Sequence, residues 1–525
     1  MKNIRVLDCT LRDGGYCNQW NFKEKNIKKI IEGLISARVE IIECGFLTDK
    51  IVYSPDAARY TDVSQLKNFI PCHDDKTKFV VMVNYGEYDV KKIPKQSQTL
   101  IDGIRVAFHK EKWHEALDMC KCLRDKGYLV FLQPMVTMLY TDEEFTELVQ
   151  RANDIRPCAF YIVDSFGTMN RKDLRHYYDL ADHTLDTEIG IGFHSHNNLQ
   201  SAFANAQSLI EKATERILYI DISIYGMGRG AGNLNSELFL SELNSEFGQN
   251  YDIKPLLQIM DEILNRFYEA SPWGYSLPNY LSAAHMIHPN YAKYLMEKNT
   301  LLLADIDEIF SMIDKDKGTE YDEKYISDLY LQYMSTGVIQ NGHLYEIKEK
   351  TKGRNILIIA PGKSANDDVE QIKECFLKEN PVVISVNHEY QFIPTDYIFV
   401  SNIRRFKQLD DRQYSKTIST SNIKSRDTYT SVDYYKLLNA NESVRDNAGL
   451  MAIKFVMDEL DICNIFIAGL DGYDKDVSMN YENENLALSM SADIMEKTNV
   501  GMRGVLKEYS KVKEINFVTS TRLKM

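Results

Sequence analysis

The residues of this chain best suited to chemistry form a charged run close behind the N-terminus. An apolar segment that starts at Ile4 leads directly into Asp8, Arg12 and Asp13, and two glycines follow. Burying a guanidinium and two carboxylates costs on the order of several kcal/mol for each group unless they pair or bind a metal. A functional site at the carboxyl end of a strand explains such a run, whereas an Arg-Asp pair that caps a turn is the structural alternative.

A second segment offers two histidines at a spacing of two residues. The alternating apolar residues Ile191 and Phe193 predict a strand that runs into His194 and His196. Side chains two positions apart on a strand point to the same face, so the two imidazoles can share a divalent ion. Asp13 would complete a set of one carboxylate and two imidazoles. A core histidine with satisfied hydrogen bonds is the alternative for either residue alone.

Composition places the chain among soluble globular proteins. It has 525 residues, of which 44% are hydrophobic and 26% charged, and a formal net charge of -14. The negative charge argues against nucleic acid as the main partner, because phosphate binding needs a basic surface. The nine cysteines lack Cys-x-x-Cys spacing, which favours reduced thiols in the cytoplasm over disulfides or structural zinc. We expect no export signal and no membrane span.

The elements that must position the charged residues follow a βαβ rhythm over the first 250 residues. Strands are expected at residues 4–8, 39–44, 79–83, 103–108, 128–133, 159–164, 189–194 and 217–224, and amphipathic helices at 24–37, 143–155 and 199–212. Eight such units in about 245 residues match the size of a (β/α)8 TIM barrel.

An open doubly wound sheet would show the same rhythm, but the polar residues favour the barrel. Side chains of functional type follow several strands: Arg12, Asp13, Glu43, Gln133, Asp164, Ser165, His194, His196 and Asn233. Only a barrel gathers all of its strand ends around one mouth.

The rest of the chain divides into two further parts. Residues 251–347 lose the strand pattern and predict a helical extension. The charged residues 348–354 are the expected linker. Residues 355–525 predict a second, smaller α/β domain, with strands at 356–360, 382–386, 397–401 and 465–468.

Three motifs at predicted strand ends carry a family resemblance over about the first 300 residues. They read Asp8-Cys9-Thr10-Leu11-Arg12-Asp13-Gly14, His194-Ser195-His196-Asn197 and Gly228-Arg229-Gly230-Ala231-Gly232-Asn233. In that order they resemble the motifs of the metal-dependent TIM-barrel lyases that include hydroxymethylglutaryl-CoA lyase and 4-hydroxy-2-oxovalerate aldolase, and the aldolase is the most similar.

The resemblance implies a divalent cation held by Asp13, His194 and His196, with Asn233 as a further ligand. Oxygen and imidazole ligands suit Mn²⁺ or Mg²⁺. The cation would polarise the carbonyl of a 2-oxo acid, so that cleavage of the adjacent C–C bond leaves a stabilised pyruvate enolate. Arg12 would add fixed positive charge at the same oxygen.

One position departs from the family pattern. The family aldolase has a histidine base three residues after its metal-binding aspartate, and this chain has Tyr16 there. A tyrosine is a poor base unless its pKa, ordinarily about 10, is lowered. Either Tyr16 or a metal-bound water takes the proton, or the substrate differs from that of the family.

Three further residues complete the predicted site. Asp164 and Ser165 end the sixth strand, where Ser165 could hold a substrate carboxylate and Asp164 could orient Arg12 or a ligand. A helix N-cap is the alternative for this pair. Glu43, at the end of the second strand, is expected to pair with Arg12.

The second domain contains the turn Ala360-Pro361-Gly362-Lys363-Ser364. It is no P-loop, because Leu357 stands where the first glycine of G-x-x-x-x-G-K-S belongs. A phosphate at the N-terminus of the following helix is still an expectation. With Val386-Asn387-His388, Phe399-Val400-Ser401-Asn402 and Ala468-Gly469-Leu470-Asp471, the turn resembles sialyltransferase-like domains, which implies nucleotide or sugar binding.

The sequence thus predicts a cytoplasmic, metal-dependent aldolase or lyase with a 2-oxo acid and an aldehyde as its small-molecule partners. A Claisen-type acyl-CoA synthase and a non-catalytic barrel scaffold are the alternatives. We expect neither nucleic acid nor membrane as a partner, and assembly into a homo-oligomer is compatible with the sequence.

Overall fold

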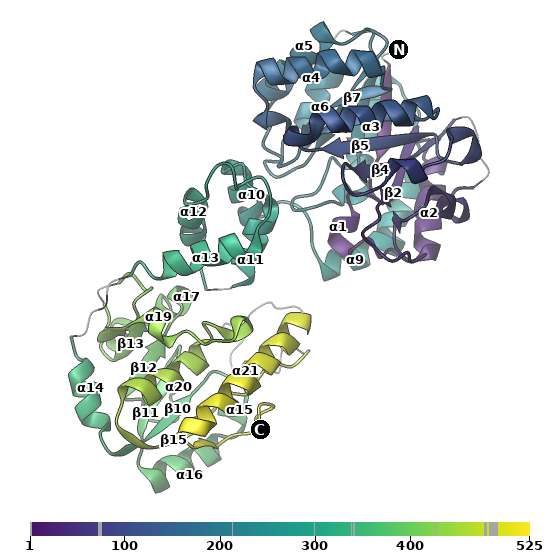
Figure 1. Cartoon of the computed structure of the whole chain (residues 1–525). Helices are drawn as coiled ribbons and strands as arrows, with labels where there is room; N and C mark the ends of the chain where they lie inside the picture. The colour runs from purple at the N-terminus through teal and green to yellow at the C-terminus, as the bar shows by residue number, and fades with distance from the viewer. Residues whose placement is uncertain are drawn as a thin grey trace. The chain divides into compact units, whose positions relative to one another are not determined.

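The computed structural model describes residues 3–71, 76–212, 214–298, 300–337, 339, 342–425, 427–476, 480–481 and 492–524. They form two compact units, which Figure 1 shows. The barrel unit comprises Met1–Ala292 and Asp314–Tyr321, and the sheet unit comprises Lys293–Ile313 and Asp322–Met525. None of the described helices combines the length and hydropathy that crossing a membrane requires. No disulfide joins the eight described cysteines, and Cys72 lies outside the described residues.

The barrel unit is built on eight parallel strands that close on themselves, as expected for a TIM barrel. They are β1 (Ile4–Asp8), β2 (Ile41–Leu47), β4 (Lys78–Asn84), β5 (Gly103–Phe108), β6 (Leu129–Pro134), β7 (Ala159–Asp164), β8 (Gly190–Ser195) and β9 (Leu218–Ile222). The pairing of β1 with β2, which places Leu7 opposite Ile41, closes the circle. The short β3 (Arg59–Tyr60) adds to the edge of β2. The predicted barrel is confirmed.

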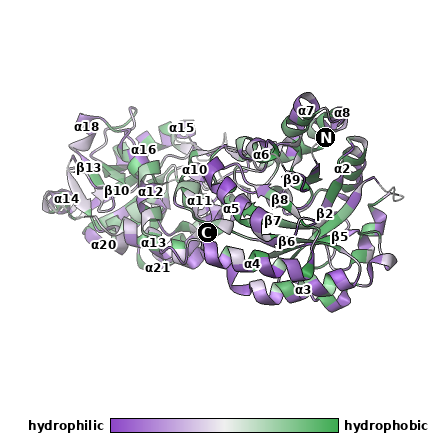
Figure 2. Ribbon diagram, turned by 90° about the horizontal axis from the view of Figure 1, so that it is seen from above, coloured by the Kyte–Doolittle hydropathy of each residue, from purple (hydrophilic) through white to green (hydrophobic). Residues whose placement is uncertain are grey.

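Helices on the outside of the barrel connect the strands. They are α2 (Glu24–Ser36), α3 (Trp113–Asp125), α4 (Asp142–Ile155), α5 (Arg171–Thr184), α6 (Ala202–Ile210) and α7 (Ser236–Phe247), and the short α1 (Gly15–Asn18) follows β1. In α2, Ile27, Ile30, Ile31 and Leu34 recur at helical spacing and are buried. Figure 2 shows hydrophobic strands such as β2 and β5, and helices such as α3 and α4 that carry hydrophilic residues as well.

Residues 251–347 are mainly helical, as predicted, and the two units divide them. The helices are α8 (Lys254–Ile259), α9 (Asn265–Ala270), α10 (Leu277–Ala284), α11 (Pro289–Glu297), α12 (Leu303–Ser311), α13 (Glu323–Met334) and α14 (Leu344–Thr351), and a π-helical turn, Met260–Leu264, joins α8 to α9. The prediction of a linker at residues 348–354 was wrong. Lys348 pairs with Glu459 and Lys350 with Asp396 at the end of α14, and β10 begins at Arg354.

The sheet unit has a seven-stranded parallel sheet in the order β14-β13-β12-β11-β10-β15-β16. Its strands are β10 (Arg354–Ile359), β11 (Val382–Val386), β12 (Tyr397–Val400), β13 (Thr417–Thr420), β14 (Thr430–Val432), β15 (Ile462–Ala468) and β16 (Ile515–Phe517). Its helices are α15 (Ser364–Asp367), α16 (Val369–Glu379), α17 (Ile403–Phe406), α18 (Asp411–Tyr414), α19 (Tyr434–Leu437), α20 (Ala448–Glu459) and α21 (Ala492–Val512). The second α/β domain is therefore confirmed.

Candidate active site

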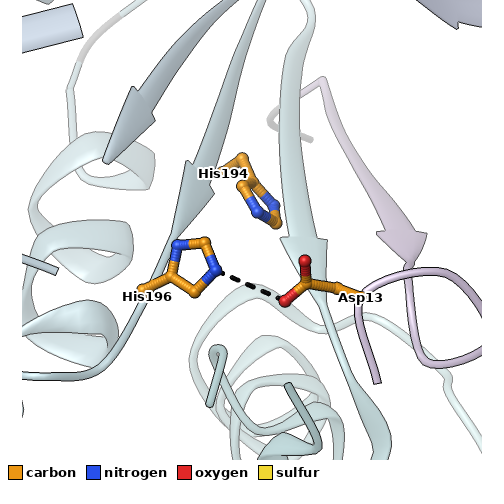
Figure 3. A group of neighbouring side chains, drawn as sticks. All are labelled: Asp13, His194 and His196. Carbon is orange, nitrogen blue, oxygen red and sulfur yellow. Dashed lines mark ion pairs between the residues drawn. The ribbon is translucent and has the colours of Figure 1, made fainter. Parts of the chain in front are cut away.

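Asp13, His194 and His196 converge at the carboxyl ends of the barrel strands (Figure 3). Asp13 lies in the turn after β1, His194 lies in β8, and His196 directly follows β8. One potential ligand atom from each residue lies within 4.8 Å of the other two. All three residues are buried, with exposures of 2%, 4% and 6%. The His-x-His spacing on a strand end and the turn after β1 therefore bring together the three side chains expected from the sequence.

Hydrogen bonds orient both imidazoles. His194 Nδ1 lies 2.8 Å from Asp221 Oδ2, and His196 Nδ1 lies 3.0 Å from the backbone oxygen of Asp164. In each ring these contacts leave Nε2 as the nitrogen available to a metal. Burial lowers the pKa of His194 to about 4, which keeps this imidazole in the neutral form that metals bind.

Two observations indicate that Asp13, His194 and His196 are suited to bind a divalent cation. His196 Nε2 is enclosed and makes no hydrogen bond to a described residue, although it lies 3.3 Å from Asp13 Oδ2. Burial alone would raise the pKa of Asp13, but Arg12 and His196 hold it well below its usual range, so the carboxylate is charged. Buried imidazole and carboxylate groups without full hydrogen bonding are the donors that a cation satisfies.

Asn233 lies beside this group. Its Nδ2 donates to Asp13 Oδ2 at 2.8 Å, and its Oδ1 is enclosed without a partner among the described residues. The approach depends on Gly228, because a Cβ there would come within 2.2 Å of Asn233 Nδ2 and 2.9 Å of Asp13 Oδ2. Asn233 Oδ1 is thus placed as a further oxygen donor next to Asp13.

Arg12 joins the group through a buried network of alternating charges. Its Nε donates to Glu43 Oε2 at 2.8 Å, the contact expected from the sequence, and its Nη1 donates to Asp13 Oδ1 at 2.5 Å. Arg105 Nη1 donates to the same Glu43 oxygen at 2.8 Å, and Arg105 Nη2 donates to Asp221. Arg12 Nη2 is enclosed and has no partner in the described part of the chain. One N–H corner of a fixed guanidinium therefore remains to bind an anion next to Asp13.

Asp164 and Ser165 make local contacts. The Asp164 carboxylate accepts the backbone N–H groups of Thr168 at 2.8 Å and Met169 at 3.2 Å, and burial raises its pKa to about 6. Ser165 Oγ accepts the N–H of Val136 at 2.8 Å. These contacts do not form the helix N-cap that was the alternative for this pair, because Asn170 caps the following helix, α5. Asp164 contributes to the candidate metal group through its backbone oxygen, which orients His196.

Tyr16 lies at the barrel mouth. It is 41% exposed, its ring centroid lies 4.7 Å from that of Trp20, and the guanidinium of Arg229 lies 5.4 Å from the centre of its ring. Desolvation raises the pKa of the phenol above 10 despite the nearby Arg229. The phenolate that a tyrosine base requires is therefore disfavoured at neutral pH.

Sequence reasoning missed four residues of the site. Arg105 and Asp221 are buried single charges within β5 and β9, and such lone charges in apolar strands signal a paired network. Arg229 was quoted only as part of a glycine-rich motif, yet its Nη2 donates to the Ser165 backbone oxygen at 3.3 Å. His288, whose Nε2 lies 3.0 Å from Arg229 Nη1, comes from the helical stretch and carries no sequence signal.

The expected phosphate position in the sheet unit is taken by a carboxylate. Asp471 Oδ2 accepts the N–H of Ser364 at 2.8 Å, and the Ser364 hydroxyl donates to Asp471 as well. The N–H of Gly362 donates to the backbone oxygen of Gly469 at 2.8 Å. These N–H groups of the glycine turn after β10 thus donate to acceptors within the protein. The expectation of a phosphate on this turn was wrong.

Comparisons with known proteins found a matching family, related sequences and solved structures. Residues 3–263 match the family described as HMGL-like. Oxaloacetate decarboxylase from Mycobacterium tuberculosis is 24% identical over 240 residues, which cover 45% of this chain and 69% of that protein. 4-Hydroxy-2-oxovalerate aldolase from Shewanella halifaxensis is 27% identical over 289 residues, which cover 52% of this chain and 83% of that protein. The solved N-terminal domain of a proposed aldolase from Bacteroides vulgatus is 28% identical, with a TM-score of 0.46, and the match covers 55% of this chain and 95% of that one. The family match ends at residue 263, so the likeness of residues 355–525 to sialyltransferases stays a prediction.

Proposed function

We propose that this protein is a carbon–carbon lyase that cleaves or forms a C–C bond next to a 2-oxo acid through a pyruvate enolate, because residues 3–263 match the HMGL-like family. The observation that carries the proposal is the convergence of Asp13, His194 and His196 beside the unpartnered Nη2 of Arg12. A cation site next to a fixed guanidinium suits a reaction in which negative charge develops on a carbonyl oxygen.

The metal-binding residues in this proposal are Asp13, His194 and His196, with Asn233 Oδ1 as a further donor. Mixed oxygen and imidazole donors suit Mn²⁺ or Mg²⁺. When bound, such a cation polarises a carbonyl and stabilises the charge that forms on it. The chain's own contribution at that oxygen is Arg12, held by Glu43 and Asp13 so that Nη2 can donate to it.

We assign the role of the base, which removes a proton from the substrate, to His288. The Arg229 Nη1 group faces its Nε2 at 3.0 Å, and the N–H of Asn290 faces its Nδ1 at 3.2 Å. A neutral imidazole can accept at only one nitrogen. His288 can therefore accept only one of these two hydrogen bonds at a time. Arg229 would form a stronger, charge-assisted hydrogen bond if it turned to a substrate carboxylate instead.

Such a turn would also make His288 a better base. Burial, followed by the positive charge of Arg229, lowers the pKa of His288 to about 3. A substrate carboxylate paired with Arg229 would offset that charge and raise the pKa towards the ordinary value of about 6.5. In aldol cleavage His288 would then remove the proton of the 4-hydroxyl group as the C3–C4 bond breaks. The bonding electrons pass into the enolate, which is protonated at C3 to give pyruvate.

The two relatives named above differ in their need for this base. Cleavage of the C3–C4 bond gives pyruvate from oxaloacetate and from 4-hydroxy-2-oxovalerate alike. Only 4-hydroxy-2-oxovalerate must lose a hydroxyl proton in that step. Decarboxylation of oxaloacetate is therefore the second candidate, and the specific observation that favours it is Tyr16 at the position of the family's histidine base.

The test is pyruvate release by the full-length protein with Mn²⁺ or Mg²⁺, with a panel of 4-hydroxy-2-oxo acids and oxaloacetate as substrates. Aldehyde as the co-product identifies an aldolase, and carbon dioxide identifies a decarboxylase. Treatment with a chelator should stop either reaction, and the metal should restore it. Release of free coenzyme A from an acyl-CoA and a 2-oxo acid, without pyruvate formation from any of the panel, would instead indicate the Claisen-type synthase. If no substrate is turned over, the non-catalytic barrel scaffold is the remaining alternative.

A further inference from the structure

The sheet unit contains a cavity of about 430 Å³ that the proposed lyase chemistry does not use. Four residues that directly follow parallel strands line it: Ala360 after β10, Asn387 after β11, Ser401 after β12 and Gly469 after β15. The chain runs from β10 outward through β11 to β14, and β15 then returns to the other side of β10. In open parallel sheets, ligands bind at the carboxyl ends of the strands where the order reverses in this way.

Backbone donors face the cavity from the start of α20, a helix of 12 residues. Ala448 and Gly449, its first two residues, line the cavity. The Oδ1 of Asn447 caps the helix by accepting the N–H of Leu450 at 3.1 Å, and its backbone oxygen accepts that of Met451 at 2.9 Å. Within the described chain, no acceptor lies opposite the N–H groups of Ala448 and Gly449. Free N–H groups at a helix N-terminus favour an anion.

Buried polar side chains without partners point to a ligand independently of the helix. Ser401 is only 4% exposed and lines the cavity, and its hydroxyl makes no hydrogen bond to a described residue. The Oδ1 of Asn387, another lining residue, is enclosed and likewise unpartnered among the residues that the structure describes. Since buried polar groups are almost always hydrogen-bonded, these two need a partner that the cavity supplies.

Both basic and acidic side chains line the cavity. Arg405, 8% exposed, and Lys298, which lies over the ring of Tyr294, bring positive charge. Two of the acids that line the cavity accept hydrogen bonds within the protein: Asp446 accepts the hydroxyl of Tyr330 at 2.5 Å, and Asp471 accepts the N–H of Ser364 at 2.8 Å. The carboxylates of Glu297, Glu323 and Glu442 line the cavity as well. The donors of α20, Ser401 and Arg405 are therefore the groups that a phosphate would meet.

We propose that this cavity binds a phosphorylated ligand of nucleotide size. Its phosphate is held by the N–H groups of Ala448 and Gly449, the Ser401 hydroxyl and the guanidinium of Arg405. A volume of about 430 Å³ is far larger than a phosphate needs and lies in the range of small-molecule sites. The ring of Tyr473 and the carboxylates of the wall suit a base and ribose hydroxyl groups.

The first test is calorimetric titration of the full-length protein with ADP, GDP, CDP and UDP, the four parent nucleosides and inorganic phosphate. We expect at least one diphosphate to bind, its nucleoside to bind at least tenfold more weakly, and the bound diphosphate to raise Tm. Absence of both heat and a Tm shift up to millimolar concentration would overturn the proposal. Equal affinity for inorganic phosphate and the diphosphates would do so too, because it would show an anion site without a nucleotide pocket.

The second test locates the binding by substitution. Ser401→Ala and Arg405→Gln should each weaken the diphosphate's affinity roughly tenfold or more, since each removes a hydrogen bond to a charged group. Ser419→Ala is the matched control, because Ser419 is a fully buried serine of β13 with an unpartnered hydroxyl that does not line the cavity. It should bind normally. If Arg405→Gln fails to fold by circular dichroism, Ser401→Ala decides. Unchanged affinity in Ser401→Ala, or an equal loss in Ser419→Ala, would contradict the assignment.

Discussion

The Nδ1 atom of His194 lies 2.8 Å from a carboxylate oxygen of Asp221, and Arg105 donates to the same oxygen. Arg105 also contacts Glu43, which holds Arg12. An imidazole of the proposed metal site and the guanidinium that would face the proposed substrate are thus positioned by one buried network. Burial opposes the ionisation of Asp221, but Arg105 keeps its pKa below the usual range, so it orients His194 as a carboxylate.

Asp221→Asn should therefore weaken Mn²⁺ binding by roughly 10- to 100-fold while the barrel stays folded, because His194 loses the charged acceptor that fixes its ring. Titration of Mn²⁺ followed by electron paramagnetic resonance measures the effect. Asp102→Asn is the control: Asp102 is also buried and accepts the N–H of Phe79 at 2.9 Å, on the other end of the strands. Equal metal affinity in Asp221→Asn and the wild type would remove Asp221 from the site.

The contrast between predicted and missed elements has a physical cause. The bounds of β1, β5 and β7 agree with the sequence prediction, because each is a short segment in which most residues are apolar and buried. The strands β13 and β14 were missed because they read Thr-Ile-Ser-Thr and Thr-Ser-Val, in which buried hydroxyl groups replace the apolar signal.

The candidate site divides in the same way. Asp13, His194 and His196 were predictable because local geometry at a strand end sets their direction. His288 was not, because its place next to Arg229 depends on how the helical stretch folds back on the barrel. That packing involves long-range contacts such as His288 N–H to the oxygen of Gly318 at 2.8 Å, which no local pattern encodes.

Arg12→Lys should leave the fold and the metal content intact while kcat for pyruvate formation falls roughly a hundredfold or more. A lysine keeps the charge but cannot contact Glu43, Asp13 and an enolate oxygen together from one planar fork. Arg216→Lys is a matched control, since Arg216 is a buried arginine that pairs with Asp182. It should keep its turnover per folded molecule. An unchanged kcat in Arg12→Lys would rule out the role.

His288→Gln should separate the two candidate reactions. Cleavage of a 4-hydroxy-2-oxo acid should slow roughly a hundredfold or more because the base is lost, whereas decarboxylation of oxaloacetate needs no base and should persist. The exposed His176, which pairs with Asp142, provides the control His176→Gln. Parallel loss of both reactions would indicate a structural role for His288. Retention of aldol cleavage would place the base elsewhere, with the lyase assignment intact.

Asp8 should make the barrel less stable as the pH rises. Burial raises its pKa to about 7, although the N–H of Thr10 and the hydroxyl of Ser236 donate to its oxygens at 2.9 and 3.1 Å. Between pH 4 and 7 the unfolded chain releases this proton while the folded one retains it, so the free energy of unfolding falls over that window.

Asp8→Asn mimics the protonated acid and should therefore raise Tm relative to the wild type by several degrees at pH 8, and by less at pH 5. Scanning calorimetry of both proteins in the presence of a chelator checks this. Stability curves that run parallel over the whole pH range would show that Asp8 does not titrate between the two states.

The last prediction concerns the smallest active fragment. The barrel unit includes Asp314–Tyr321, because the Tyr291 hydroxyl donates to the oxygens of Lys317 and Glu320 at 3.0 and 2.7 Å, and His288 contacts Gly318. Residues 1–321 contain the whole barrel unit together with Lys293–Ile313 of the sheet unit, and they should therefore fold, bind metal and release pyruvate. A fragment that extends to residue 347 adds α13, whose buried Tyr330 loses its partner Asp446, and it should aggregate more readily.

Residues 1–292 provide the internal comparison. This fragment lacks the segment that holds His288, so aldol cleavage should fall more steeply than decarboxylation, while metal binding persists because Asp13, His194 and His196 are unaffected. Circular dichroism, Mn²⁺ titration and pyruvate release measure the three properties separately. If residues 1–321 are folded and bind metal yet form no pyruvate where the full chain does, the sheet unit contributes to the active site and the chemistry does not reside in the barrel unit alone.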